Sequence, residues 1–378
     1  MILLFVAALV LCLPITVRAE EYDEEVEYEL LRQIEEAGLD PLSEYLEDIS
    51  SFTGEDFESV DKMIFELSER GFSGGVSGVF ESIKAVLTTE LRKAASPLAA
   101  LTAAALLTLF SETVSDEGVK HVLSVILGLS SAALCIGSLS VLFNNVYSVI
   151  NETEELAQRT VPVVSALMIA SGSELFSPIL LFLSGTVISL IKGIIMPLII
   201  AEGAVSAAYA LTDRSGFDGL LKLIGKTVKW LLGLISVVYL GTVSVRGITG
   251  SVRNGVLLRS SKYALDKLVP SANGLVSGTV DTVLGCALLI KNGTGIALVM
   301  ILISRVLRPV FGLLAGMLIF RAAAAISGPL ADKRIVKLYG NAADTVSNMF
   351  TCAAVSASML AVTLFVMIAS GGSSLGIL

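Results

Sequence analysis

The segment Arg259–Leu302 reads RSSKYALDKLVPSANGLVSGTVDTVLGCALLIKNGTGIALVMIL. A basic stretch leads to Pro270, a Gly/Ser-rich approach follows, and an apolar run is then interrupted by Lys291, Asn292 and two glycines. A lysine at the centre of a membrane span costs about 2.5–3.5 kcal/mol on insertion scales. The Lys291 ammonium is therefore expected either at a membrane interface or packed against other parts of the protein.

The composition of the whole chain is that of a membrane protein. Of 378 residues, 54% are hydrophobic and 16% are charged, and the mean hydropathy is +0.81. Soluble domains carry roughly 25% charged residues. The apolar runs are long, whereas a transmembrane barrel would alternate apolar and polar residues over short segments. These features predict an all-α, polytopic helical membrane protein.

The apolar runs predict seven or eight membrane spans after an N-terminal leader. The predicted spans are 97–111, 119–143, two within 161–211 that part near Ser184-Gly185, 230–248, 284–304, 309–326 and 346–370. The polar stretches 144–160, 212–229, 305–308 and 327–345 are interpreted as loops, and 251–283 is too polar to span. Because successive loops are basic, the positive-inside rule leaves the orientation open.

Three shorter parts precede the membrane domain. Residues 1–19 have the apolar run and the small-residue site of a cleavable signal peptide, with an uncleaved anchor as the alternative because the basic start is weak. Residues 20–70 are interpreted as an acidic extracytoplasmic head. Residues 71–96 form a Gly-rich joint and an amphipathic helix in the membrane interface. Residues 97–378 make up the multi-span membrane domain.

The charge is unevenly distributed along the chain. The head, 20–70, holds 19 acidic and three basic residues, while the rest holds 16 acidic and 23 basic residues. A solvated head that contacts a partner explains the acidic run better than catalysis by its carboxylates. The mildly basic remainder suits contact with an anionic lipid bilayer, and nothing in it indicates nucleic acid binding.

Charged residues in or beside the spans are candidates for a polar pathway or for pairing between helices. They are Lys192, Glu202, Arg246, Asp281 and Lys291. The alternative is that their side chains extend to the lipid headgroups. Lys192 and Glu202 flank Pro197, and ten residues place them about 280° apart on a regular helix, so they share a face only if the helix is kinked.

Two GxxxG patterns and a weak repeat concern helix packing. Gly312 and Gly316 lie within a predicted span, and Gly274 and Gly278 lie in the approach segment; both pairs permit close helix contact. Val-Ser-Gly at 76–78 recurs 200 residues later at 276–278, each time ahead of a span. This offset is either a transporter-like repeat or a coincidence of a Val-, Ser- and Gly-rich chain.

The sequence offers no set of residues for catalysis. Gly225-Lys226-Thr227 resembles the end of a phosphate-binding loop, but the glycine required five residues earlier is Leu220. The single histidine, His121, has no cysteine cluster beside it, so a zinc or haem site is not expected. The four cysteines lie in the leader or in apolar runs. We therefore predict a protein that is not an enzyme and has no cofactor or metal.

The central block is similar to the stage III sporulation protein AE family of endospore-forming bacteria. The resemblance is carried by Lys262-Tyr263, Val269-Pro270, the run Ser277–Val283, and Leu288–Asn292 with Gly295. The plan of leader, acidic head, interfacial helix and multiple spans is also similar, although the head matches only in character.

The resemblance implies a non-enzymatic membrane subunit of the secretion-like channel between mother cell and forespore, needed for late forespore development. It implies other stage III sporulation membrane and ring proteins and an external cytoplasmic ATPase as partners. It also implies a multi-pass location in the mother-cell membrane that surrounds the forespore. Two other interpretations stay open: a self-sufficient transporter or permease, and an adaptor whose acidic head recruits partners.

Overall fold

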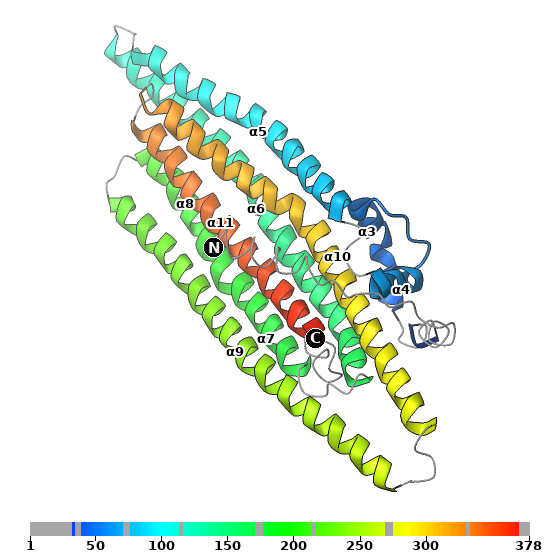
Figure 1. Cartoon of the computed structure of the whole chain (residues 1–378). Helices are drawn as coiled ribbons and strands as arrows, with labels where there is room; N and C mark the ends of the chain where they lie inside the picture. The colour runs from blue at the N-terminus through cyan, green and yellow to red at the C-terminus, as the bar shows by residue number, and fades with distance from the viewer. Residues whose placement is uncertain are drawn as a thin grey trace.

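The fold is a bundle of long helices with a small helical head on one side (Figure 1). The computed structural model describes residues 32–34, 39–70, 76–112, 116–170, 177–212, 216–268, 275–329 and 333–369. Its elements are η1 (Asp40–Tyr45), α3 (Leu46–Thr53), α4 (Val60–Arg70), α5 (Val76–Glu112), α6 (Glu117–Ala170), α7 (Ser177–Leu190), η2 (Ile191–Ile195), α8 (Met196–Thr212), α9 (Gly216–Leu268), α10 (Leu275–Ser327) and α11 (Lys333–Ala369). The described residues contain no strand, as the all-α prediction requires.

The long helices run antiparallel along a common axis. We call the end where α5, α8 and α10 finish and α6, α9 and α11 begin the loop end; it lies at the upper left of Figure 1. Helices α6, α9 and α10 contain 54, 53 and 53 residues. At 1.5 Å per residue each is about 80 Å long, against about 30 Å for the hydrocarbon core of a bilayer.

Five helices in the described residues are long and apolar enough to cross a membrane. They are Glu117–Thr160, Leu183–Tyr209, Phe217–Val243, Gly293–Ser327 and Lys333–Val366. This confirms the polytopic helical class. The helices are fewer and longer than the seven or eight predicted spans, because several stretches interpreted as loops are helical.

The clearest corrections concern polar stretches inside helices. Residues 144–160 lie within α6, and 305–308 lie within α10, which continues through Pro309. Helix α9 begins at Gly216 inside the predicted loop 212–229, and α5 joins the predicted interfacial helix to the predicted first span through Pro97. Glu, Gln, Leu and Arg are good helix formers, so a fall in hydropathy ends a membrane span without ending a helix.

The predicted break at Ser184-Gly185 is also wrong. Helix α7 continues through both residues, and the irregularity lies later, in the π-helical turn η2, where the Met196 N–H donates to the Ile191 carbonyl. Pro197 follows at once. A proline ring clashes with the carbonyl four residues earlier, and a widened turn relieves this clash without ending the helix.

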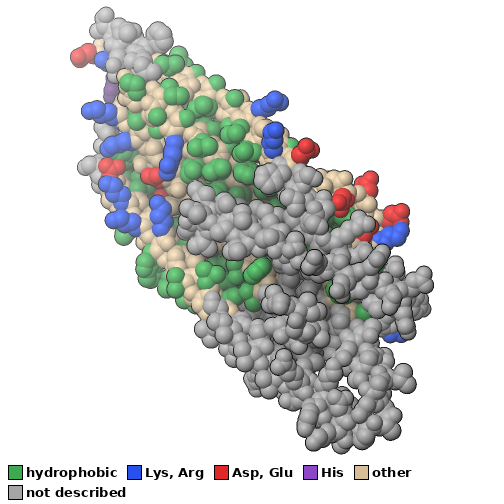
Figure 2. All heavy atoms as spheres, in the orientation of Figure 1, with side chains coloured by type: hydrophobic (Ala, Val, Ile, Leu, Met, Phe, Trp, Pro, Cys, Tyr) green, Lys and Arg blue, Asp and Glu red, His purple; other side chains and the backbone are tan. Residues whose placement is uncertain are grey.

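Helices α10 and α11 form the centre of the bundle. In the most apolar 18-residue stretch of each helix, 72% of the residues of α10 and 67% of those of α11 are buried. The corresponding fraction is 22% in α6 and in α9. The outer helices therefore expose large apolar side chains, including Val122 and Ile126 on α6 and Trp230 and Val237 on α9. Figure 2 shows hydrophobic side chains spread over the described surface near the loop end. These are the side chains that can face lipid.

The head is packed on the bundle. Elements η1, α3 and α4 enclose Leu42, Ile49 and Ile64, and they lie against α5 and α10 (Figure 1). The Ser82 hydroxyl of α5 donates to the Phe52 carbonyl at 2.9 Å. Residues 39–67 thus form a small helical unit with one side packed on the bundle, while the extracytoplasmic location of the head stays a prediction. The leader and residues 20–31 lie outside the described residues.

Candidate functional site: a polar pocket between three helices

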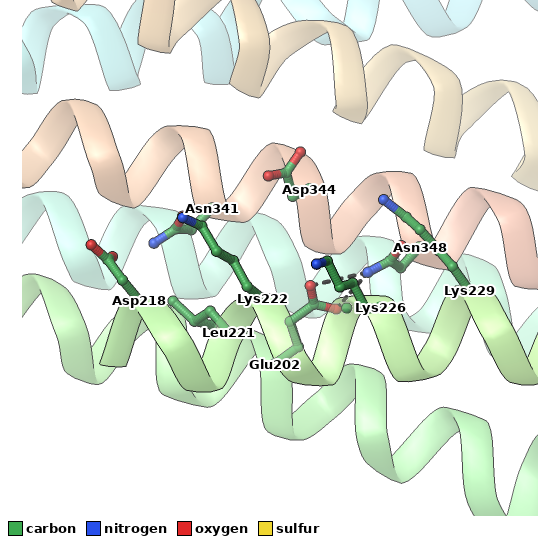
Figure 3. A pocket seen from close by; sticks show the side chains of 10 residues that line it. Glu202, Asp218, Leu221, Lys222, Lys226, Lys229, Asn341, Asp344 and Asn348 are labelled. Carbon is green, nitrogen blue, oxygen red and sulfur yellow. Dashed lines mark hydrogen bonds between the residues drawn. The ribbon is translucent and has the colours of Figure 1, made fainter. Parts of the chain in front are cut away.

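A buried carboxylate on α8 is the most unusual polar group in the apolar part of the bundle. Glu202 is 4% exposed. The Nδ2 of Asn348, on α11, donates to both carboxylate oxygens, at 3.0 and 2.7 Å (Figure 3). Asn348 is itself 1% exposed. The nearest partner of a buried anion is thus a neutral amide, which satisfies hydrogen bonds without cancelling the charge.

Gly225 on α9 lets a third helix approach this pair. A Cβ at Gly225 would lie 2.8 Å from Oε1 of Glu202 and 3.4 Å from Nδ2 of Asn348. A Cβ atom does not approach an oxygen to within 2.8 Å, so a side chain at Gly225 would displace the Glu202 carboxylate or the helix. Gly225 lies inside a helix, and its role in the Gly-Lys-Thr sequence is close packing.

The three helices leave a cavity of about 210 Å³ beside Glu202. It is lined by Glu202, Asp218, Leu221, Lys222, Gly225, Lys226, Lys229, Asn341, Asp344 and Asn348. We call these residues the Glu202 pocket. In Figure 3 the three lysines extend from α9 toward α11. Glu202 and Asn348 are buried, and the lysines are exposed, so the pocket has a protein-enclosed floor and a charged mouth.

The charges around the mouth are only partly paired. Asp218 accepts from the Lys337 ammonium at 3.4 Å, and the same ammonium donates to the Tyr209 hydroxyl at 2.7 Å. Lys222, Lys226 and Lys229 have no ion-pair partner in the part of the chain that the structure describes.

Two buried amide atoms also lack hydrogen-bond partners among the described residues: Oδ1 of Asn348 and Nδ2 of Asn341. Both atoms are almost inaccessible to solvent, and they belong to residues that line the pocket, so a ligand would reach them only after a small shift of the amide groups.

The other charged candidates are separated from Glu202. Lys192 forms an ion pair with Glu154 of α6, so the two charges that flank Pro197 face different helices. Arg246 lies in α9, and Asp281 and Lys291 lie in α10, at positions whose side chains are outside the described residues. The structure brings together none of the described members of the predicted set. It groups Glu202 with residues outside that set, of which Gly225 and Lys226 were considered only as the end of a phosphate-binding loop.

Of the two GxxxG patterns, the structure describes the packing of the second one along the chain, at Gly312 and Gly316. A Cβ at Gly312 would lie 2.6 Å from Nδ2 of Asn145, and one at Gly316 would lie 2.6 Å from the Leu142 methyl carbons of α6. Helices α6 and α10 therefore meet at these glycines. Gly274 lies outside the described residues, and Gly278 lies in the first turns of α10, where only the backbone is described.

A second polar group joins the head to the bundle. Arg305 of α10 donates to Asp48 at 2.8 Å and to Glu152 of α6 at 3.1 Å, and its guanidinium lies 4.9 Å from the centroid of the Tyr45 ring. We call these four residues the Tyr45 cluster. Burial raises the pKa of the Tyr45 phenol above its ordinary value. Beside the cluster, Arg159 of α6 pairs with Glu44 of the head.

Comparison with known proteins identifies the family. The family model for stage III sporulation protein AE matches residues 59–371, which is most of the chain. The chain belongs to the stage III sporulation protein AE family. The stage III sporulation protein AE of Bacillus subtilis (strain 168) is 28% identical over 242 residues, covering 63% of this chain and 61% of that relative. No solved structure matches the chain.

Family membership confirms the resemblance carried by the central block. The match begins at residue 59, inside the head, and includes all of α5 to α11. Both the Glu202 pocket and Arg305 therefore lie in the part of the chain that the family shares. Much of the head, including Asp48 and Tyr45, lies before it.

Proposed function

We propose that the protein is a non-enzymatic membrane subunit of the channel complex between mother cell and forespore, needed for late forespore development. Membership in the stage III sporulation protein AE family carries this proposal. In it, the partners are other stage III sporulation membrane and ring proteins and a cytoplasmic ATPase. The location is the mother-cell membrane around the forespore.

Two features of the structure suit a subunit of a larger assembly. The long helices exceed the thickness of a bilayer and offer surface beyond it for partners. The docked head retains exposed carboxylates, such as those of Glu55 and Asp56. In this function the Glu202 pocket is a polar element within the membrane helices.

The test is a purification of the tagged protein from sporulating cells in mild detergent, followed by identification of the co-purified chains. We expect membrane and ring proteins together with an ATPase. A homo-oligomer without other chains would contradict the proposal.

A Glu202→Gln variant tests whether the pocket is a polar pathway. Loss of sporulation with assembly intact supports a polar pathway, and normal sporulation excludes it. Glu117→Gln, an exposed carboxylate at the start of α6, is the control.

The alternative is a self-sufficient transporter, and the buried Glu202 in a polar pocket is the observation that favours it. The 200-residue repeat stays a prediction. Residues 76–78 and 276–278 lie in the first turns of α5 and α10, and both helices run toward the loop end (Figure 1). Solute flux by the purified chain alone in vesicles, abolished by Glu202→Gln, would favour the transporter.

A further inference from the structure

The volume of the Glu202 pocket suits a small polar ligand. Its volume of about 210 Å³ is large enough for several water molecules. Glu202 lies ten residues before the end of α8 at Thr212, so the pocket is about 15 Å from the loop end.

The floor of the pocket offers hydrogen-bond acceptors. The Glu202 carboxylate and the Oδ1 of Asn348 are both buried, and Oδ1 has no partner among the described residues. The Asn348 amide nitrogen is committed to Glu202, which orients Oδ1 away from that carboxylate. A buried acceptor without a partner is unfavourable, so a donor from a ligand would stabilise the floor.

The mouth of the pocket offers donors. Lys222, Lys226 and Lys229 follow one another at spacings of four and three residues, which places their side chains on one side of α9. The Nδ2 of Asn341, which is buried whereas the lysines are exposed, is a further donor that has no partner in the described part of the chain. Three ammonium groups and an amide N–H would bind the oxygens of an anionic group such as a phosphate.

A ligand with one kind of charge fits only half of this pocket. The lining holds carboxylates at Glu202, Asp218 and Asp344 as well as the three ammonium groups, so a simple anion would meet the carboxylates and a simple cation would meet the ammonium groups. A zwitterion satisfies both ends when its cationic end reaches Glu202 and Asn348 and its anionic end stays among the lysines.

The surroundings of the mouth point to the source of such a zwitterion. Leu220, Leu223 and Trp230 are exposed on α9 next to the lysines, at 42%, 63% and 65%. An apolar surface of this kind in a membrane helix is covered by acyl chains, and tryptophan is enriched where a bilayer meets water. A phospholipid could therefore place its headgroup in the pocket and its chains along α9.

We propose that the Glu202 pocket binds a zwitterionic group made of a phosphate and a primary ammonium, as in the headgroup of phosphatidylethanolamine. The ammonium donates to Glu202 and to Oδ1 of Asn348. The phosphate accepts from Lys222, Lys226, Lys229 and Asn341. The same chemistry occurs in free phosphoethanolamine, and the experiment distinguishes the two sources.

The experiment measures binding to the purified full-length protein in detergent by native mass spectrometry and by the shift of the thermal unfolding midpoint. The probes are phosphatidylethanolamine, phosphatidylglycerol, which has the phosphate without the ammonium, and free phosphoethanolamine. We expect phosphatidylethanolamine to bind at least tenfold more tightly than phosphatidylglycerol. Preference for phosphoethanolamine would retain the site and assign it to a soluble ligand.

Three variants connect binding to the pocket. Lys222→Met/Lys229→Met and Asn341→Leu should each weaken binding at least tenfold, and neither touches the hydrogen bonds between Glu202 and Asn348. Glu202→Gln should abolish the preference for phosphatidylethanolamine over phosphatidylglycerol. Lys120→Met, an exposed lysine near the loop end on α6, is the matched control and should bind normally.

Three results would overturn the proposal. They are equal or tighter binding of phosphatidylglycerol, absence of binding by all three probes, and binding that the pocket variants leave unchanged. Because Asn341→Leu removes an amide nitrogen that has no hydrogen-bond partner in the described residues, this variant should fold normally and keep the test valid if Glu202→Gln does not. These outcomes do not depend on whether the protein belongs to a channel complex.

Discussion

The Glu202 pocket and the Tyr45 cluster both hold carboxylates between helices, but they satisfy them differently. In the cluster, Arg305 pairs with Asp48 and Glu152, and all three side chains are partly exposed. In the pocket, Glu202 is almost fully buried and its hydrogen bonds come from a neutral amide. Paired, half-solvated charges are suited to holding one part of a protein on another. A buried anion with unused polar neighbours is suited to a ligand or a solute.

Among the variants that test this comparison, Asn348→Leu is expected to have the largest effect on stability. It removes both hydrogen bonds to the buried Glu202 carboxylate, which should lower the free energy of unfolding by about 3 kcal/mol. The double variant Glu202→Leu/Asn348→Leu removes both partners and should recover most of that loss. Thermal unfolding in detergent measures both. If the double variant is as unstable as the sum of the single variants, the two residues do not act as a pair.

Gly225→Ala tests how closely α9 must approach the same carboxylate. The new Cβ would meet Glu202 Oε1 at 2.8 Å, whereas a Cβ at Gly219, on the same helix, would meet nothing within 4 Å. Overpacking destabilises at the first site, and alanine stabilises a helix at the second, so the two variants should differ by about 2 kcal/mol. Equal unfolding midpoints would show that the helices can separate at no cost.

Arg305→Met tests whether the Tyr45 cluster holds the head. Its ion pairs are partly exposed, so the expected loss is about 1 kcal/mol, smaller at high salt. Limited proteolysis should cut the head faster in this variant. Arg308→Met is the control, because Arg308 is mostly exposed and lies 3.7 Å from Glu90. Equal cleavage of the two variants would mean that apolar packing alone holds the head.

Glu55→Gln/Asp56→Asn should have the smallest effect on stability, within about 0.5 kcal/mol, because both side chains are exposed. If the head recruits partners through its charge, the same variant should reduce the co-purified chains several-fold. The readout is the pull-down from sporulating cells. Unchanged co-purification would exclude these two carboxylates from partner binding and leave the head a structural part of the bundle.

The helical class and Glu202 could be predicted because each leaves a local signal. Long apolar runs require helices in a membrane, and a carboxylate within such a run is conspicuous. The helix ends could not be predicted, because the stretch 144–160 is polar yet rich in helix formers and contains neither glycine nor proline.

The partners of the polar groups could not be predicted for a different reason. Asn348 is a neutral residue in an apolar helix, and it meets Glu202 across 146 positions of the chain. Arg305 and Asp48 are 257 positions apart. Single-sequence patterns report spacing along one element and carry no information on which distant element packs against it. The spacing of Lys222, Lys226 and Lys229 was a visible signal, but the stretch around them was interpreted as a loop.

The π-helical turn at Ile191–Ile195 changes the direction in which side chains point along an otherwise continuous helix. It accommodates one extra residue, which turns everything after it by about 100° relative to a regular helix. Upstream of Pro197, Lys192 can therefore meet Glu154 of α6, while downstream Glu202 meets Asn348 of α11. One continuous helical segment thus contacts α6 through Lys192 and α11 through Glu202. The irregular turn between these residues determines the direction in which the buried carboxylate points.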